Sequence, residues 1–331
     1  MGDPTVKVIV TGGAGFIGSH VCEALLSAGH EVTSLDNFNP FYDPAVKRRN
    51  IREILRHPQA ARFKSVRADI RDRAAMNRVF RAFHPAMVIH LAAMAGVRPS
   101  IENPLLYGDV NVKGTQVLLE ACRLSGVKHF IFASSSSVYG NNKKVPFSEK
   151  DRVDRPISPY AATKKAGELL CHIYSSLYRM NVCVLRFFTV YGPRQRPDLA
   201  IHKFTKLLFE NKPIPFFGDG KTSRDYTYID DTVDGVLKAL RWTAGHGKKG
   251  AYEIFNLGES RTVSLKRMVS CLEEVIGKKA RLRRLPPQKG DVARTFADIS
   301  KARKILGYAP VAQFREGVVR FVNWYRRHAG S

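Results

Sequence analysis

Short apolar runs alternate with amphipathic segments along the first half of the chain. Apolar runs of about four to eight residues are typical of buried strands, and an apolar repeat of 3.6 residues is typical of helices. Their alternation predicts an α/β fold, in which helices cover both faces of a parallel sheet. The expected strands are residues 6–10, 31–36, 62–68, 86–93 and 128–135, and the expected helices are 19–28, 46–56, 111–125 and one beginning at Pro159.

The texture of the sequence changes after Tyr191. Proline, glycine and basic residues become denser there, and helical stretches are expected only at residues 201–210 and 264–276. We therefore expect a Rossmann-type, doubly wound parallel sheet over residues 1–190 and a smaller, mainly substrate-binding lobe over 191–331. The gradual change in composition also predicts that the chain crosses back between the two lobes.

Charge is the unusual property of this composition. Lys and Arg number 54 against 29 Asp and Glu, so the formal net charge is +25. A polyanionic partner is one interpretation. The basic residues lie in small, scattered groups without interleaved aromatic residues, however, which argues against a nucleic-acid partner and leaves most of the excess unexplained.

The remaining composition indicates an ordinary globular enzyme. No apolar run approaches the length of a membrane span, and five cysteines are scattered without a CxxC pair. Reduced thiols suit such a pattern better than disulfides do, so we expect a cytoplasmic protein. The sequence near the start passes almost directly into the strand VKVIV without a leader pattern. We expect no metal site.

A glycine-rich turn, TGGAGFIG, follows the first expected strand. Gly12, Gly15 and Gly18 permit a tight turn and close approach to a pyrophosphate, which the next helix would face with its N-terminus. Asp36 ends the second strand, where a carboxylate binds an adenosine ribose diol and repels a 2′-phosphate, so NAD is the expected cofactor. The other expected cofactor contacts are Phe16, Ile17, Asn37, Asp69, Ile70, Leu91, Ala92 and Ala93.

Tyr160 and Lys164 are four residues apart in SPYAATKKAGE. This spacing places both side chains on one face of a helix. Because a phenol titrates near pH 10, it is a weak base at neutral pH, and a nearby ammonium group would lower its pKa. The pair therefore predicts an acid/base centre that also touches the cofactor.

These features together resemble the extended short-chain dehydrogenase/reductases that modify nucleotide sugars. The resemblance extends over TGGAGFIG, Asp36, SSSSVYG and the Tyr160/Lys164 pair. It implies that Tyr160 is the acid/base, that Lys164 lowers its pKa and holds the nicotinamide ribose, and that a serine hydrogen-bonds the reacting hydroxyl. Ser135 aligns with that serine, and Ser137 shares its face if the strand stays regular.

The residues before VYG separate the reactions of this family. Dehydratases resemble TDEVYG, and UDP-glucuronate decarboxylases carry a Glu before VYG, whereas this chain has Ser136 and Ser137. Elimination and decarboxylation both lose support, and the 4-epimerase reaction remains. A UDP-sugar substrate is then expected.

The segment FFTVYGPRQRPDLA is most similar to that of UDP-glucuronate 4-epimerases. The resemblance implies that Thr189 and Arg196 meet the sugar carboxylate, and a UDP-glucose or UDP-N-acetylhexosamine 4-epimerase is the alternative. It also implies a homodimer, formed through a four-helix bundle of the helices at 111–125 and 159–179. The remaining expected substrate contacts are Arg98, Ser135, Ser136, Phe217, Gly218, Arg224 and Asp291.

Overall fold

A parallel sheet of seven strands forms the centre of the computed structural model, which describes residues 5–247, 249–286 and 292–328. Its strand order is β11-β6-β5-β4-β1-β2-β3, and every neighbouring pair runs parallel. The chain reverses its direction of travel across the sheet between β1 and β4, where doubly wound folds bind their ligands. The strands are β1 (Lys7–Thr11), β2 (Glu31–Asp36), β3 (Phe63–Arg67), β4 (Met87–His90), β5 (His129–Ser135), β6 (Asn181–Phe187) and β11 (Tyr252–Leu257).

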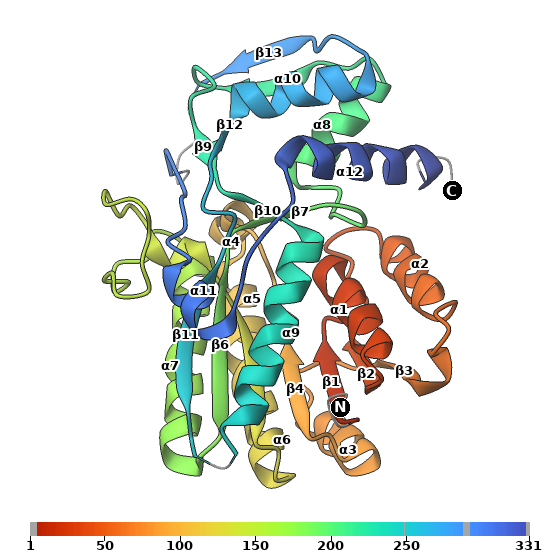
Figure 1. Cartoon of the computed structure of the whole chain (residues 1–331), viewed down its shortest axis with the longest axis vertical. Coiled ribbons are helices and arrows are strands. Elements are labelled where there is room, and N and C mark those ends of the chain that lie inside the picture. The colour runs from red at the N-terminus through yellow and green to blue at the C-terminus, as the bar shows by residue number, and fades with distance from the viewer. Residues whose placement is uncertain (1–4, 248, 287–291, 329–331) are drawn as a thin grey trace.

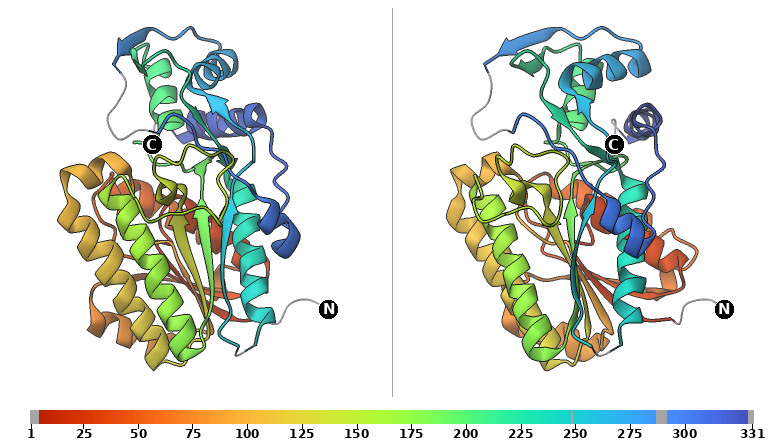
Figure 2. Two further views of the ribbon diagram at one scale, coloured as in Figure 1. Left: turned by 90° about the vertical axis from the view of Figure 1, so that its left-hand side faces the viewer. Right: turned by 60° about the vertical axis from the view of Figure 1, so that its left-hand side comes forward.

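Helices cover both faces of this sheet because its strands are apolar on both sides. In β1, Val8 and Val10 join one buried cluster and Ile9 joins the other, as the two-residue period of a strand requires. Figures 1 and 2 show the two helical layers on either side of the sheet. One layer holds α1 (Phe16–Ser27), α2 (Pro44–Ile54) and α9 (Ile229–Gly245), and the other holds α3 (Arg73–Phe83), α6 (Gly114–Leu124) and α7 (Pro159–Tyr178).

A smaller lobe lies beyond the carboxyl ends of the strands, at the top of Figure 1. It contains two short pairs, β8 with β13 and β9 with β12, while β7 pairs with β10 at the junction. Its elements are β7 (Thr189–Tyr191), α8 (Ala200–Phe209), β8 (Ile214–Phe217), β9 (Ser223–Arg224), β10 (Tyr226–Tyr228), β12 (Val263–Ser264), α10 (Leu265–Ile276), β13 (Leu282–Leu285) and α12 (Phe314–His328).

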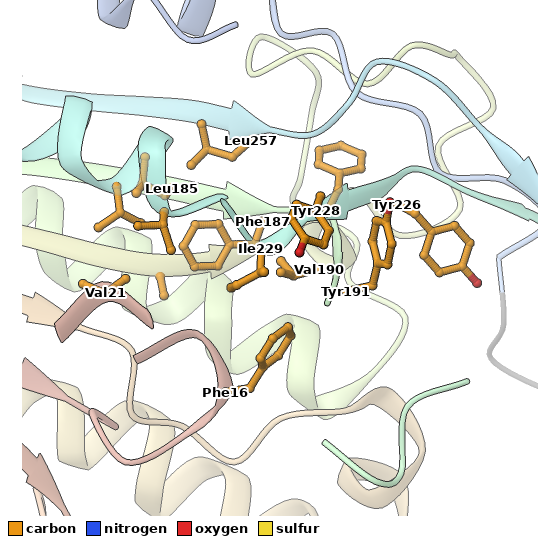
Figure 3. Packing of buried hydrophobic residues seen from close by; sticks show 14 of the residues in the cluster. Phe16, Val21, Leu185, Phe187, Val190, Tyr191, Tyr226, Tyr228, Ile229 and Leu257 are labelled. Carbon is orange, nitrogen blue, oxygen red and sulfur yellow. The ribbon is translucent and has the colours of Figure 1, made fainter. Parts of the chain in front are cut away.

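Aromatic packing joins the two lobes. The ring of Tyr191 meets those of Tyr226 and Tyr228 edge-on, at 6.0 and 5.5 Å between centroids. Its hydroxyl donates to the carbonyl of Phe314 at 3.2 Å. Figure 3 shows these rings in one apolar layer with side chains of the central sheet and α1. A continuous core therefore fixes the smaller lobe above the sheet.

The predicted fold class is confirmed, and the departures from the expected boundaries are local. β4 ends at His90, so Ala92 and Ala93 lie in a loop rather than in a strand. The helix expected at 111–125 is a π-helical segment, η2 (Gly108–Lys113), followed by α6. After residue 191, α9 and β11 return to the sheet, as does α11 (Ser300–Leu306), which packs against them. The short elements are η1 (Ala60–Arg62), α4 (Val97–Glu102), α5 (Pro104–Tyr107) and η3 (Ser136–Tyr139).

Within the described ranges, none of the helices combines the length and the low polarity that spanning a bilayer requires.

Candidate active site

A cavity of about 460 Å³ opens between the sheet and the smaller lobe. It lies at the carboxyl ends of β1, β2, β4 and β5, on the side where the direction of the chain reverses. Most of the residues singled out from the sequence line it. They are Gly12, Gly15, Phe16, Ile17, Gly18, Asp36, Asn37, Ile70, Leu91, Ala92, Ala93, Ser135, Ser136, Ser137, Tyr160, Lys164, Thr189, Arg196 and Arg224.

The glycine turn leaves the N-terminus of α1 open toward this cavity. Gly15 precedes the helix and supplies no side chain to cap its free N–H groups. Gly12 adopts a φ of +70°, and a Cβ atom at Gly18 would lie 2.2 Å from the Gly12 carbonyl oxygen. Glycine is therefore required at both positions, and the uncapped N–H groups suit a pyrophosphate.

Asp36 has one carboxylate oxygen engaged and the other available. Its Oδ1 accepts hydrogen bonds from the Phe38 amide at 2.8 Å and from Lys47 Nζ at 3.2 Å. No described residue hydrogen-bonds its Oδ2, which matches the ribose contact expected from the sequence. Lys47, buried against the Tyr42 ring, is a cavity residue that sequence reasoning missed. The only feature of the nearby sequence that could have indicated Lys47 is that it is a basic residue one turn after the start of α2.

Several expected contacts do not line the cavity. The Asp69 carboxylate accepts hydrogen bonds from Arg71 and Asn37, which with the Arg71 charge hold its pKa well below its usual range. Arg98 is exposed, with its guanidinium 5.6 Å from the ring centre of Phe217. The amide of Gly218 donates to the Leu285 carbonyl at 2.9 Å. Asp291 lies outside the described residues.

Tyr160 faces the cavity from the first turn of α7. The pKa of its phenol is raised, because burial outweighs a hydrogen bond with Ser135 and the positive charge of Arg196, both of which lower it. The strand β5 ends at Ser135, as expected, and the next residues form the 3₁₀ turn η3, so the condition of a regular strand up to Ser137 is not met. The Ser137 hydroxyl nevertheless donates to Ser135 Oγ at 3.0 Å. Both hydroxyls are thus near the phenol by way of one hydrogen-bonded chain.

Lys164 is buried on α7, one helical turn after Tyr160. Burial lowers the pKa of its ammonium group to about 8. Its Nζ donates to the Ala133 carbonyl at 2.7 Å and lies 5.2 Å from the Phe132 ring centre. Arg196 and Ser135 act against the effect of burial on the Tyr160 phenol, and the remaining donors of Lys164 Nζ could bind a ribose hydroxyl.

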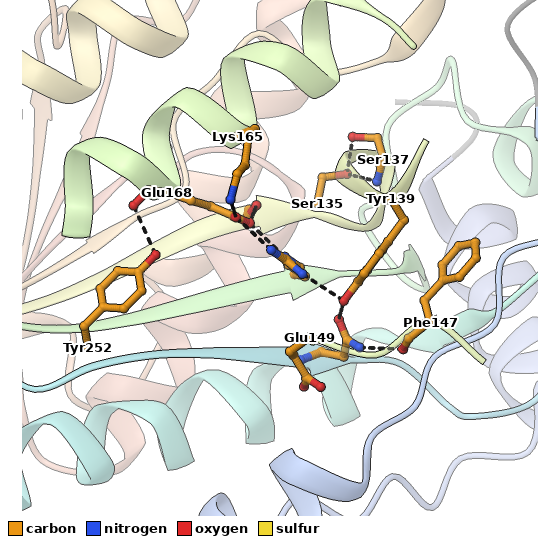
Figure 4. Close-up of polar contacts among 11 residues, drawn as sticks. Ser135, Ser137, Tyr139, Phe147, Glu149, Lys165, Glu168 and Tyr252 are labelled. Carbon is orange, nitrogen blue, oxygen red and sulfur yellow. Dashed lines mark hydrogen bonds and ion pairs between the residues drawn. The ribbon is translucent and has the colours of Figure 1, made fainter. Parts of the chain in front are cut away.

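A buried polar network holds the strands β5 and β6 against the helix α7 (Figure 4). Glu168 accepts from Arg186 Nε at 2.8 Å and Nη2 at 2.9 Å, and from Ser134 Oγ at 2.7 Å. Burial would raise the pKa of Glu168, but the hydrogen bonds of Arg186 and its charge outweigh burial and lower it. Arg186 Nη1 also donates to the Tyr139 hydroxyl at 3.0 Å. The network fixes Ser134 and Lys165, which are adjacent in sequence to Ser135 and Lys164.

Arg196 reaches the cavity from the segment after β7. Its Nε and Nη2 donate to Asp198 at 2.9 and 2.6 Å, and its guanidinium lies 5.1 Å from the Phe41 ring centre. Among the described residues, none hydrogen-bonds Nη1, which is the nitrogen left for a ligand. Thr189 lines the same side, where its amide donates to the Asp225 carbonyl at 3.0 Å.

The fold and this cavity define an extended short-chain dehydrogenase/reductase. The uncapped helix end, the free Asp36 oxygen, and the Tyr160 and Lys164 side chains fit NAD in one cavity. Within the described residues no cluster of three or more metal-ligating side chains occurs.

Comparison with known proteins identifies the family. The GDP-mannose 4,6 dehydratase family profile matches residues 9–321, and the chain belongs to this family. A UDP-glucuronate 4-epimerase of Thermodesulfobacterium geofontis is 44% identical over 97% of this chain and 96% of its own length.

Solved structures agree with this assignment. A Bacillus cereus UDP-glucuronic acid 4-epimerase, in complex with UDP-glucuronic acid and NAD, has a TM-score of 0.88 at 38% identity and covers 97% of this chain and 99% of its own. A Thermotoga maritima UDP-glucose 4-epimerase with UDP-glucose has the same TM-score at 34% identity, covering 98% and 99%. The similarity in fold therefore does not distinguish UDP-glucuronate from UDP-glucose as the substrate.

Replacing Gly18 by Ala should weaken NAD binding by about 2 kcal/mol, roughly thirtyfold in affinity, because the added Cβ displaces the turn. Calorimetric titration of NAD into cofactor-free protein measures this loss. Gly108→Ala is the matched control, since its Cβ would meet no atom within 4 Å. Equal affinity in the two variants would contradict the assignment of the turn.

The free energy of unfolding should depend on pH because Lys164 is buried. Its pKa is about 8 in the folded protein against 10.5 as the reference, so the unfolded chain binds more protons between these values. Relative to Lys164→Met, the cofactor-free wild type should therefore gain up to about 3 kcal/mol of unfolding free energy as the pH rises through this window. Urea unfolding across the window measures the gain, with the exposed Lys203→Met as control. Parallel curves for wild type and Lys164→Met would refute the shift.

Proposed function

We propose that this protein catalyses the NAD-dependent 4-epimerisation of a UDP-sugar, and that UDP-glucuronate, converted to UDP-galacturonate, is the favoured substrate. The observation that carries the proposal is the combination of side chains around Tyr160. Ser135 and Arg196 favour its phenolate, while Ser136 and Ser137 occupy the positions where dehydratases and decarboxylases would need carboxylates. The cavity thus has a base for a hydroxyl and no second acid/base pair before VYG.

In this reaction Tyr160 accepts the proton of the C4 hydroxyl and later returns it to the opposite epimer. NAD, when bound, takes up a hydride from C4 and gives it back. Ser135 orients the reacting oxygen, and Lys164 holds a ribose hydroxyl of the cofactor. Rotation of the 4-keto sugar about its link to the diphosphate exposes the other face. Arg224 at the cavity wall is the candidate for the diphosphate.

A uronate carboxylate would meet Arg196 Nη1 and the Thr189 hydroxyl. Arg196 is fixed by Asp198 and Phe41, so it presents one nitrogen in a defined direction. This contact supports UDP-glucuronate, as does the identity of 44% to a UDP-glucuronate 4-epimerase. The same Asp198 partly neutralises the guanidinium, which favours a neutral UDP-hexose as the alternative substrate.

Product analysis of the purified protein with UDP-glucuronate, and separately with UDP-glucose, tests the proposal. We expect UDP-galacturonate from the first and at least about tenfold lower kcat/KM with the second. Arg196→Met should lose uronate turnover and shift the pH profile for any remaining activity upward, because its charge lowers the pKa of Tyr160.

Tyr160→Phe should abolish epimerisation of every sugar while leaving NAD bound. Retention of wild-type epimerisation by Tyr160→Phe would disprove the mechanism, and turnover of UDP-glucose alone would replace the uronate by the neutral sugar.

We further propose that the protein forms a homodimer through α6 and α7. Leu169, Ile173 and Leu177 follow one another at four-residue spacing on α7, and their side chains are 56%, 45% and 66% exposed. Leu124 at the end of α6 is 53% exposed. An apolar stripe of this kind is typical of helix-to-helix interfaces.

The five buried free cysteines support a reducing, cytoplasmic location.

Light scattering of the wild type at micromolar concentration should give twice the 37.1 kDa chain mass. Leu169→Arg combined with Leu177→Arg should give the monomer, because charges would be buried between the two α7 helices. Leu55→Arg, at the exposed leucine that directly follows α2, is the control and should remain dimeric. A monomeric wild type would refute the interface.

A further inference from the structure

Arg194 lies two residues before Arg196 but points away from the cavity, into the layer of helices that follows the cofactor turn. Its Nη1 and Nη2 donate to the two carboxylate oxygens of Glu23 at 2.9 and 2.7 Å, and its Nε donates to Glu53 at 2.7 Å. Glu23 belongs to α1 and Glu53 to α2. The two helices that border the NAD site are thus tied to the segment that carries the expected carboxylate contact.

Resting on the function proposed above, we propose that Arg194 is a positioning residue that holds Arg196 in place and thereby keeps a uronate from losing its carboxyl group. Nothing in this role requires Arg194 to touch the substrate. It acts through the backbone of residues 194–196, which is too short to absorb a movement at one end.

The contacts of Arg194 leave it little freedom to move. Its side chain is only 9% exposed, and both partner carboxylates are half-buried, at 26% and 19%. Five N–H donors in a planar fork suit such a three-point attachment, which Lys could not reproduce. Arg194 also has a φ of +64°, a conformation that a non-glycine residue adopts only where its surroundings impose it.

Neighbouring residues of this segment are anchored as well. The Pro193 carbonyl oxygen lies 3.0 Å from His20 Nε2 on α1, and burial together with the Arg194 charge lowers the pKa of His20 to about 3. Gln195 Nε2 donates to the Val190 carbonyl at 3.2 Å. Arg196 is therefore the residue of this run that turns into the cavity, from a backbone fixed on its N-terminal side.

Carboxylate position matters because the oxidised substrate is a β-keto acid. If the C5–C6 bond aligns with the π system of the C4 carbonyl, that bond breaks and carbon dioxide leaves. The electron pair moves into an enolate, C5 takes up a proton, and a 4-keto-pentose forms. The hydride taken from C4 then stays on NADH. A loosened Arg196 should consequently produce carbon dioxide, UDP-4-keto-pentose and NADH in equal amounts.

Arg194→Gln tests the proposal, with Arg52→Gln as the control, an exposed arginine of α2 whose loss changes the net charge equally. We expect Arg194→Gln to raise KM for UDP-glucuronate about tenfold, to change kcat/KM for UDP-glucose much less, and to raise carbon dioxide released per epimerisation about tenfold. Calorimetric titration should show the same selective loss of affinity for UDP-glucuronate, independently of turnover.

Equal effects on both sugars, or unchanged product partition in a folded Arg194→Gln, would overturn the proposal while leaving the proposed function intact. A wild type that does not epimerise UDP-glucuronate would overturn both. Because Arg194→Gln leaves two carboxylates without their cation, Glu53→Gln provides the second variant. It should change the preference for UDP-glucuronate over UDP-glucose in the same direction by a smaller factor. If Arg194→Gln does not fold, an unchanged preference in Glu53→Gln would equally refute the role of Arg194.

Discussion

The wall of the cavity formed by β5 and α7 depends on a charge pair that water does not reach. Glu168 of α7 and Arg186 of β6 are each about 1% exposed and share two hydrogen bonds. Removing both charges from water is costly, and the pair is tolerable only when its remaining donors and acceptors are satisfied. Ser134, Lys165 and Tyr139 satisfy them. The requirement fixes α7 against β5 at one register, so it also fixes what α7 carries.

The residues to which the proposed chemistry is assigned are adjacent in sequence to residues of this network. Ser134 precedes Ser135 in the strand, and Lys164 lies one helical turn before Glu168, so both are aligned by a network that does not enter the cavity. Tyr139 extends the network to Asn256 of β11 at 2.7 Å. Through β11, a part of the chain beyond residue 191 helps to hold the proposed acid/base residues. The proposed catalytic centre therefore does not depend on one continuous stretch of sequence.

Sequence reasoning identified cavity residues where a motif is defined by local spacing. The glycine turn, Asp36, Ser135 and the Tyr160/Lys164 pair are each recognised within a few residues, and all line one cavity. It did not identify interactions between residues that are distant in sequence. Lys47 reaches Asp36 across a loop, and the charge of Arg196, thirty-six residues away in sequence, lowers the pKa of the Tyr160 phenol. Spacing predicts that two side chains share a helix face, but it does not predict which groups around them lose water.

Arginine has three different tasks in the interior, although all three involve carboxylates. Arg186 satisfies a buried glutamate, Arg194 joins two helices, and Arg196 meets the cavity while bound to Asp198. In the proposed reaction, a uronate would meet a guanidinium whose direction Asp198 fixes and whose charge it partly offsets. A contact of moderate strength in a fixed direction suits an enzyme that must turn its substrate over between two hydride transfers, because a very strong grip on one orientation would raise the barrier to rotation. Asp198 would thus tune Arg196 for orientation, while the diphosphate would supply the larger part of the affinity.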